Sequence, residues 1–189
     1  MKQITCVLSI LIFTLTACGS PIEENMSRDV EDFEGTNQDG ETITFPDHFE
    51  GDYWIANFIF TRCDTVCPPM TSNMSRLQQQ LEKNQLETPL VSFSADPEYD
   101  TEKKLKEFAN QFEADFATWD FMTGYEFQDV KELSIKSFQS PLNQLEDSDQ
   151  VAHGTSFFLV NPDGKVIKSY DGTKAKEMGN ILEDVKKLQ

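Results

Sequence analysis

A single run of eight residues constrains the fold of this chain more than any other feature. Tyr53–Phe60 has the sequence YWIANFIF, which is almost continuously apolar and rich in aromatic and β-branched side chains. A strand with one wet face alternates apolar and polar residues, whereas a strand buried on both faces does not. The run therefore predicts a central strand of a sheet that is covered by helices on both faces.

The segments around this strand complete an α/β pattern. Phe33–Phe45 alternates polar and apolar residues around a Gln-Asp-Gly turn, which predicts an N-terminal β-hairpin. Apolar spacing and turn residues predict the remaining elements. The expected helices are one from Pro69 past Leu81, Thr101–Phe112, Glu126–Ile135 and Thr173–Leu188, and the expected strands are Pro89–Ala95, Thr118–Met122, Ser156–Val160 and Lys165–Tyr170. This order predicts a thioredoxin-like fold with a mixed central sheet.

The N-terminal residues have the pattern of an export signal. Lys2 is the only charged residue of Met1–Ala17, and the apolar run Ile4–Leu15 is short for a membrane-spanning helix. The run ends in Leu-Thr-Ala-Cys18-Gly, which resembles a bacterial lipobox. That resemblance implies a lipoprotein signal peptide over residues 1–17, a lipid on Cys18, a polar tether within residues 18–30 and one domain over residues 31–189. A plain signal peptide or an N-terminal anchor helix is the alternative.

The charge balance excludes one class of partner. The 189 residues include 16 basic and 33 acidic side chains, for a net charge of −17. Such a surface repels phosphate backbones and anionic lipid headgroups, so we expect no nucleic-acid partner. It would attract cations or a basic protein, or it would serve only to keep an exported domain soluble.

Two cysteines remain for chemistry once the signal is set aside. Cys6 leaves with the signal and Cys18 receives the lipid, so Cys63 and Cys67 form one closely spaced pair. A loop this short constrains little of the unfolded chain, which argues against a purely structural disulfide. Residues four apart at a helix start have Cα atoms about 6 Å apart, which suits either a disulfide or one soft metal ion. The spacing leaves redox and metal chemistry open.

The residues around the pair exclude two familiar redox classes. Three residues separate Cys63 from Cys67, whereas a thioredoxin-type oxidoreductase has two. A peroxiredoxin has a threonine three residues before its reactive cysteine, and Phe60 and Asp64 occupy those positions here. Peroxide reduction is therefore not expected.

A histidine is expected to join the cysteines. His153 precedes the predicted strand Ser156–Val160, and in thioredoxin-like folds the loop at that point reaches back over the active cysteines. Thioredoxins place a cis-proline there, which this chain lacks. Two thiolates and one imidazole favour copper, so we expect Cys63, Cys67 and His153 to be metal ligands. The alternative is a loop imidazole satisfied by local contacts, and His48 is expected to lie on the surface.

Other candidate ligands have simpler interpretations. Met70 and Met74 have the spacing of core residues in a helix. Asp96 and Asp100 precede a predicted helix that Asp100 or Thr101 can cap, so for the two aspartates a capping role is favoured over a role around a metal. Asp64, between the two cysteines, is interpreted either as raising the basicity of the metal site or as a solvated side chain.

Three motifs together resemble the Sco/SenC family of copper proteins. Phe60–Pro68 is similar to that family's CxxxCP motif, Asp96–Thr101 to its DPxxDT segment, and His153–Leu159 to its histidine-plus-strand block. The resemblance spans about Phe33 to Leu188 and is closest to the Gram-positive bacterial lipoprotein type. It implies a copper chaperone with Cys63, Cys67 and His153 as ligands, which assembles the Cu-A centre of cytochrome c oxidase.

The implied partners are the Cu-A-bearing oxidase subunit, a thiol reductant protein and, through the lipid, the extracytoplasmic face of the cell membrane. A metallochaperone is a binding and transfer protein rather than an enzyme. A second interpretation is a membrane-tethered thiol–disulfide reductase that keeps the oxidase cysteines reduced, and a third is a copper or redox sensor. The reductase needs both cysteines and has little use for His153, so this histidine discriminates between the first two.

Overall fold

The computed structural model describes residues 20–63, 65–145 and 148–189. The predicted signal peptide, residues 1–17, and the predicted lipidation site Cys18 lie outside the described residues. Within the described ranges, no helix combines the length and the apolar character that crossing a membrane requires.

A six-stranded mixed sheet forms the centre of the molecule, with strand order β1-β10-β9-β4-β5-β6. β4 lies in the middle, parallel to β5 and antiparallel to β9, and all of its residues are buried, as the apolar run predicts. The strands are β1 (Arg28–Asp29), β4 (Trp54–Ile59), β5 (Leu90–Ser94), β6 (Trp119–Met122), β9 (Ser156–Val160) and β10 (Lys165–Asp171).

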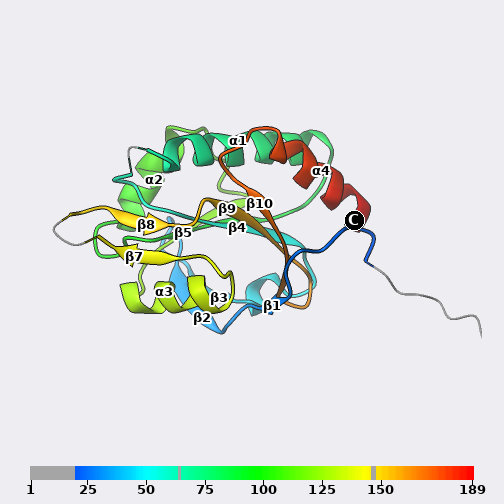
Figure 1. The fold of residues 1–189 in the computed structure, drawn as a ribbon. Coiled ribbons are helices and arrows are strands. Elements are labelled where there is room, and N and C mark those ends of the chain that lie inside the picture. The colour runs from blue at the N-terminus through cyan, green and yellow to red at the C-terminus, as the bar shows by residue number, and fades with distance from the viewer. Residues whose placement is uncertain (1–19, 64, 146–147) are drawn as a thin grey trace, which may run out of the picture.

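Helices cover both faces of this sheet. Figure 1 shows α1 and α4 on one face and α3 on the other, while α2 packs beside the edge strand β6. The helices are α1 (Cys67–Lys83), α2 (Glu102–Asn110), α3 (Phe127–Lys136) and α4 (Glu177–Leu188), with a short 3-10 turn η1 (Asp47–Phe49) before β4. The expected thioredoxin-like α/β fold is therefore confirmed.

Two small antiparallel ribbons complete the fold. The N-terminal hairpin of β2 (Phe33–Thr36) and β3 (Thr42–Phe45) is present as predicted. The second ribbon, β7 (Leu142–Gln144) and β8 (Val151–His153), was not predicted from the sequence. Its strands are only three residues long, too short to give a clear alternation of polar and apolar side chains.

Helix boundaries differ from the expected ones at two places. α1 begins at Cys67 rather than at Pro69, because Pro68 fits the first turn of a helix, where its missing N–H is not needed. α4 begins at Glu177 rather than at Thr173. The Thr173 N–H and hydroxyl both donate to the Asp171 carboxylate, and this local bonding holds the chain in a turn before the helix starts.

The segment before the hairpin packs on the domain. Ile22 and Val30 are buried, and the backbone N–H groups of Asn25 and Met26 donate to the Ile167 carbonyl. The first strand, β1, pairs with β10. Contacts with the sheet thus start upstream of residue 31, within the segment expected to be a tether.

Candidate metal centre

The two cysteines lie between the central strand and the first helix. Cys67 is the first residue of α1, whereas Cys63 lies in the turn before it rather than in the helix. The Cys67 N–H, one of the free donors of the helix start, donates to Cys63 Sγ at 3.4 Å. Both thiols are free and buried, with residue exposures of 5% for Cys63 and 0% for Cys67.

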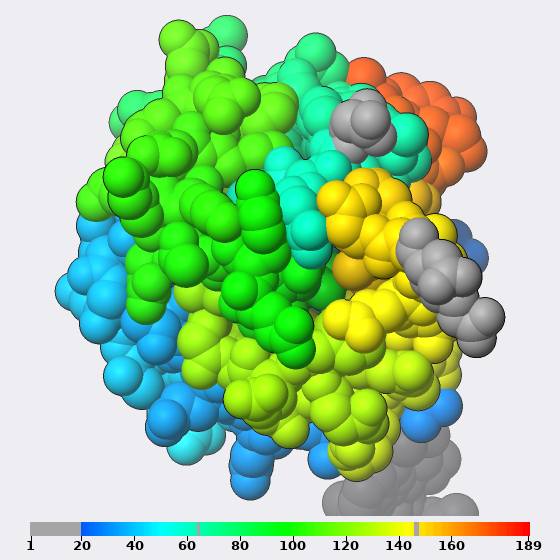
Figure 2. All heavy atoms as spheres, turned by 90° about the vertical axis from the view of Figure 1, so that its left-hand side faces the viewer, coloured from blue at the N-terminus to red at the C-terminus, as the bar shows by residue number. Residues whose placement is uncertain are grey.

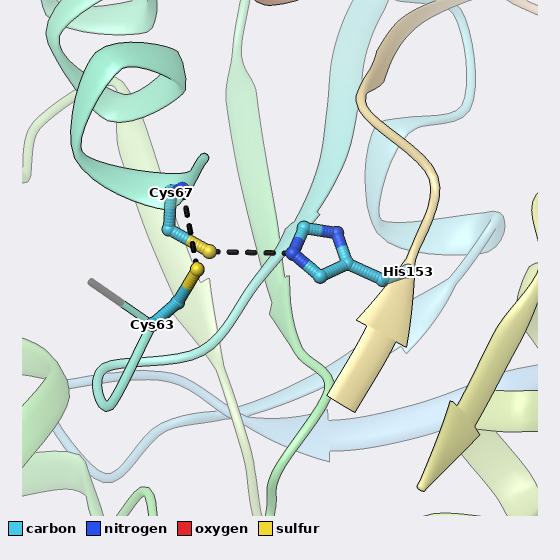
Figure 3. Close-up of side chains that lie close together, drawn as sticks. All are labelled: Cys63, Cys67 and His153. Carbon is cyan, nitrogen blue, oxygen red and sulfur yellow. Dashed lines mark hydrogen bonds between the residues drawn. The ribbon is translucent and has the colours of Figure 1, made fainter. Parts of the chain in front are cut away.

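The second ribbon places His153 opposite the cysteines. His153 ends β8, and its Nε2 lies 3.3 Å from Cys67 Sγ (Figure 3). Its Nδ1 lies 2.8 Å from the Gly154 carbonyl oxygen, which can only accept a hydrogen bond, so Nδ1 carries the proton. Nε2 is therefore unprotonated and its lone pair points toward the sulfur atoms. An imidazole nitrogen binds a metal ion through such a lone pair. The Phe60 ring packs edge-on against the imidazole.

These three side chains form one compact set of donor atoms. One donor atom each from Cys63, Cys67 and His153 lies within 4.8 Å of the others. It is the one group of three or more cysteine, histidine or carboxylate side chains within the described residues that is this compact. Two sulfurs and one imidazole nitrogen suit a soft or borderline ion, and they fit copper better than a hard ion such as magnesium.

The cysteine pair shares one proton. A hydrogen bond from the Cys67 thiol lowers the pKa of Cys63 to about 2, although burial opposes this shift. The same hydrogen bond, together with burial, raises the pKa of Cys67. Because Cys63 Sγ also accepts the Cys67 N–H, the negative charge of the pair is favoured on Cys63, and a metal ion that binds both sulfurs displaces the proton held by Cys67.

A buried carboxylate holds the cysteine loop. Asp100 is fully buried and accepts hydrogen bonds from the Thr61 N–H at 3.1 Å, from the Thr61 hydroxyl, and from the Ser94 hydroxyl at 2.6 Å. Burial raises the pKa of Asp100. The expected capping role is wrong for Asp100, because the side chain of Thr101 caps α2 by accepting from the Lys104 N–H.

The second aspartate has a different partner. Asp96 accepts from Arg62 Nε at 2.8 Å and Nη2 at 2.6 Å, so it fixes the residue before Cys63 and does not cap the helix. Sequence reasoning missed Arg62 and the loop-holding role of Asp100. The sequence signal that could have indicated them is the group of polar residues where the neighbouring strands β4 and β5 end, Thr61 and Arg62 after β4 and Ser94 and Asp96 at the end of β5.

Three of the remaining candidates are placed as expected. Met70 and Met74 are fully buried core residues of α1, and His48 is exposed. Asp64 lies outside the described residues.

The fold and the cluster together define a class: a thioredoxin-like protein in which a CxxxC pair and a histidine converge as a potential metal site. The model of the SCO1/SenC family matches residues 23–189. This chain belongs to the SCO1/SenC family.

Individual relatives agree with this assignment. The chain is 43% identical to the SCO1 protein homolog of Bacillus subtilis strain 168, over 98% of this chain and 97% of the relative. A SCO1/SenC family lipoprotein from Bacillus anthracis has a similar structure, with a TM-score of 0.82 and 41% identity over 87% of this chain and 98% of that chain. BsSco, a member of the Sco family of cytochrome c oxidase assembly proteins in which a disulfide switch has been identified, matches with a TM-score of 0.79 and 42% identity over 87% of this chain and 95% of that chain.

Proposed function

We propose that this protein is a copper chaperone that delivers copper to the Cu-A centre of cytochrome c oxidase, with Cys63, Cys67 and His153 as the copper ligands. The observation that carries the proposal is the convergence of their three donor atoms within 4.8 Å. Membership of the SCO1/SenC family and the similarity to BsSco support the oxidase as the destination.

The redox state of the cysteine pair controls loading. In the disulfide state both sulfurs are bonded to each other, and neither is free to bind copper. A dithiol reductant protein opens the bond by supplying two electrons and becomes a disulfide itself. The reduced pair, with Cys63 already a thiolate, then takes up the ion together with His153. Copper leaves by exchange of these ligands for those of the acceptor.

The cellular setting follows from the N-terminal residues. We infer a lipoprotein with a signal peptide over residues 1–17, a lipid on Cys18, a linker within residues 18–30 and the folded domain after it, held at the extracytoplasmic face of the cell membrane. The lipobox-like sequence and the similarity to a B. anthracis lipoprotein support this arrangement.

A thiol–disulfide reductase is the second candidate function. The lowered pKa of Cys63 favours it, because a thiolate is the species that attacks a disulfide, and a disulfide switch is known in BsSco. Such a reductase would transfer electrons through Cys63 and Cys67 and would need no metal.

A copper titration distinguishes the two functions. The reduced domain from Ser20 onward is titrated with Cu(I) against a competing chelator, beside His153→Ala and, as a matched control, His48→Ala. We expect one tight equivalent in the parent and in His48→Ala, and a loss of affinity of about 100-fold or more in His153→Ala, because a lost ligand costs at least as much as a lost outer partner. Equal, weak binding in all three proteins would favour the reductase.

A further inference from the structure

A groove lies beside the candidate metal centre. Its volume is about 410 Å³, and it separates the loop between β5 and α2 from the β7–β8 ribbon. Figure 2 looks onto this end of the molecule and shows the hollow between the green segment around residue 100 and the yellow ribbon, with the cyan cysteine loop beside it. Arg62, which precedes Cys63, and Val151, two residues before His153, both line the groove. The groove is therefore next to the site from which copper would leave.

Two exposed apolar side chains line this otherwise polar groove. Among the described residues, three large hydrophobic side chains are more than a third exposed: Tyr99 at 37%, Leu145 at 47% and Ile135 at 47%. Tyr99 and Leu145 lie on opposite walls of the groove. The Tyr99 ring is held by two cations, with Arg62 Cζ 4.2 Å and Lys104 Nζ 3.2 Å from its centroid. A fixed aromatic side chain and an exposed leucine on facing walls are features of a protein-binding surface.

The strand that carries His153 presents a free edge. Its ladder with β7 includes hydrogen bonds from the Leu145 N–H to the Gln150 carbonyl and from the Gly154 N–H to the Pro141 carbonyl. Hydrogen-bonded pairs alternate in an antiparallel ladder, so the backbone groups of Val151 and His153 point away from β7. In the part of the chain that the structure describes, these groups have no hydrogen-bond partner. Figure 3 shows β8 between the cysteines and β7, with this edge on the cysteine side.

The charge of the groove defines the partner further. Its lining includes the carboxylates of Asp96, Glu98 and Asp149 and the cation Arg62, and Lys104 lies against the Tyr99 ring, so acidic side chains outnumber basic ones by three to two. Asp96 and Asp149 both contact the Arg62 guanidinium, and Asp149 keeps a side-chain exposure of 61%. Glu98 is exposed, so the groove retains an excess of negative charge toward solvent. A positively charged side chain is complementary to it.

We infer that this groove docks an extended segment of the copper-accepting protein that carries lysine or arginine next to its cysteines. The segment pairs with the free edge of β8, as in β-strand addition. Its apolar side chains contact Tyr99 and Leu145, and its basic side chain lies beside Glu98 and Asp149. This pairing places the acceptor thiols over Cys63 and Cys67. The identity of the acceptor rests on the proposed function, whereas the chemistry of the docked segment rests on the groove.

A peptide titration tests the groove separately from the metal. The probe is a ten-residue peptide with one cysteine between two lysines and flanking valines, and its matched control has glutamates in place of the lysines. Both are titrated into ¹⁵N-labelled, reduced, metal-free protein with a phosphine reductant present. We expect saturable shifts from the lysine peptide at the amides of Tyr99, Leu145, Val151 and His153, and no saturation with the glutamate peptide.

Variants provide the second arm of the experiment. Leu145→Ala and Glu98→Gln should each weaken the lysine peptide about threefold or more, which corresponds to about 0.7 kcal/mol. Ile135→Ala, which removes the exposed hydrophobic side chain outside the groove, should leave binding unchanged. All three variants should retain the copper affinity of the parent.

Several results would overturn the inference. Equal binding of both peptides would do so, as would chemical-shift changes centred outside the groove. So would peptide binding that is unchanged in Leu145→Ala and Glu98→Gln, or a loss of copper affinity in those variants as large as their loss of peptide affinity. A parent that binds the lysine peptide but no copper would refute the proposed function and leave the groove standing. A parent that binds copper but neither peptide would refute the groove alone.

Discussion

Replacement of Asp100 by alanine should destabilise the reduced protein by about 3 kcal/mol, because it leaves three donors, one fully buried and two half-buried, without an acceptor. These donors are the Thr61 N–H, the Thr61 hydroxyl and the Ser94 hydroxyl. Each unsatisfied buried donor costs about 1–3 kcal/mol. Part of this loss is recovered because the variant no longer buries a carboxyl group. The cost of that burial is visible in the parent as the raised pKa of Asp100.

Urea unfolding measures this loss directly. Trp54 and Trp119 are fully buried, so their fluorescence reports the global transition. With a slope of about 2 kcal/mol per molar urea, a loss of 3 kcal/mol lowers the midpoint by about 1.5 M. Asp29→Ala is the matched control, because Asp29 has a side-chain exposure of 87% and its partner Lys165 is 3.8 Å away. That variant should change stability by less than about 0.5 kcal/mol.

Hydrogen exchange locates the effect. The Thr61 amide should lose its protection in Asp100→Ala, since the carboxylate is its acceptor. A loss of stability no larger than that of Asp29→Ala would refute the reasoning, as would unchanged protection of the Thr61 amide. In either case the cysteine loop would be held by contacts other than this carboxylate.

Three further predictions follow from single contacts. A hydrogen bond from the Cys67 thiol lowers the pKa of Cys63 to about 2, so the reduced, metal-free protein should show the 240 nm absorbance of one thiolate per chain at pH 5. Cys67→Ala removes that thiol and should abolish this absorbance at pH 5. Gly154→Ala should cost about 2 kcal/mol in urea unfolding and weaken copper binding, because the new Cβ would lie 2.1 Å from Ser140 Oγ, and Ser140→Gly should restore both. Burial alone would raise the pKa of Asp184, but hydrogen bonds from Lys168 and Tyr170 lower it below 3.8. This carboxylate therefore stabilises the fold above pH 3.8, and the stabilisation is lost as the pH falls through the pKa of the folded state. The difference in stability between the parent and Asp184→Asn should accordingly shrink between pH 7 and pH 2 in urea titrations, and a constant difference would contradict the assignment.

The elements around the site could be predicted because their signals are local. The apolar run of β4 specifies a strand buried on both faces, and the spacing of Met70, Met74, Leu77 and Leu81 specifies the buried face of α1. The order of strands and helices then implies which loop carries the cysteines. Each of these inferences depends on neighbours within a few residues, where periodicity and turn chemistry act.

The charge arrangement of the site could not be predicted in this way. The sequence presents Cys63 and Cys67 as equivalent thiols at a helix start, and Asp100 as one of two candidate helix caps beside Thr101. In the folded chain the thiol and the N–H of Cys67 both donate to Cys63 Sγ, and Asp100 accepts from Thr61, 39 residues earlier in the chain. Which thiol is ionised and which carboxylate is buried depend on these contacts, and spacing carries no information about them.

The sequence by itself determined the kinds of atoms available to the site, two thiols and an imidazole, and the sheet and helix that hold the cysteine pair. Only the tertiary structure decided that the imidazole faces the sulfurs, through a ribbon of two three-residue strands that brings His153 to Cys67 across 86 residues of chain. The groove beside the site is likewise a product of packing between the cysteine loop, the β5–α2 loop and that ribbon. The physical reason is that local patterns specify elements, whereas the meeting of elements distant in sequence depends on how all of their buried faces pack at once.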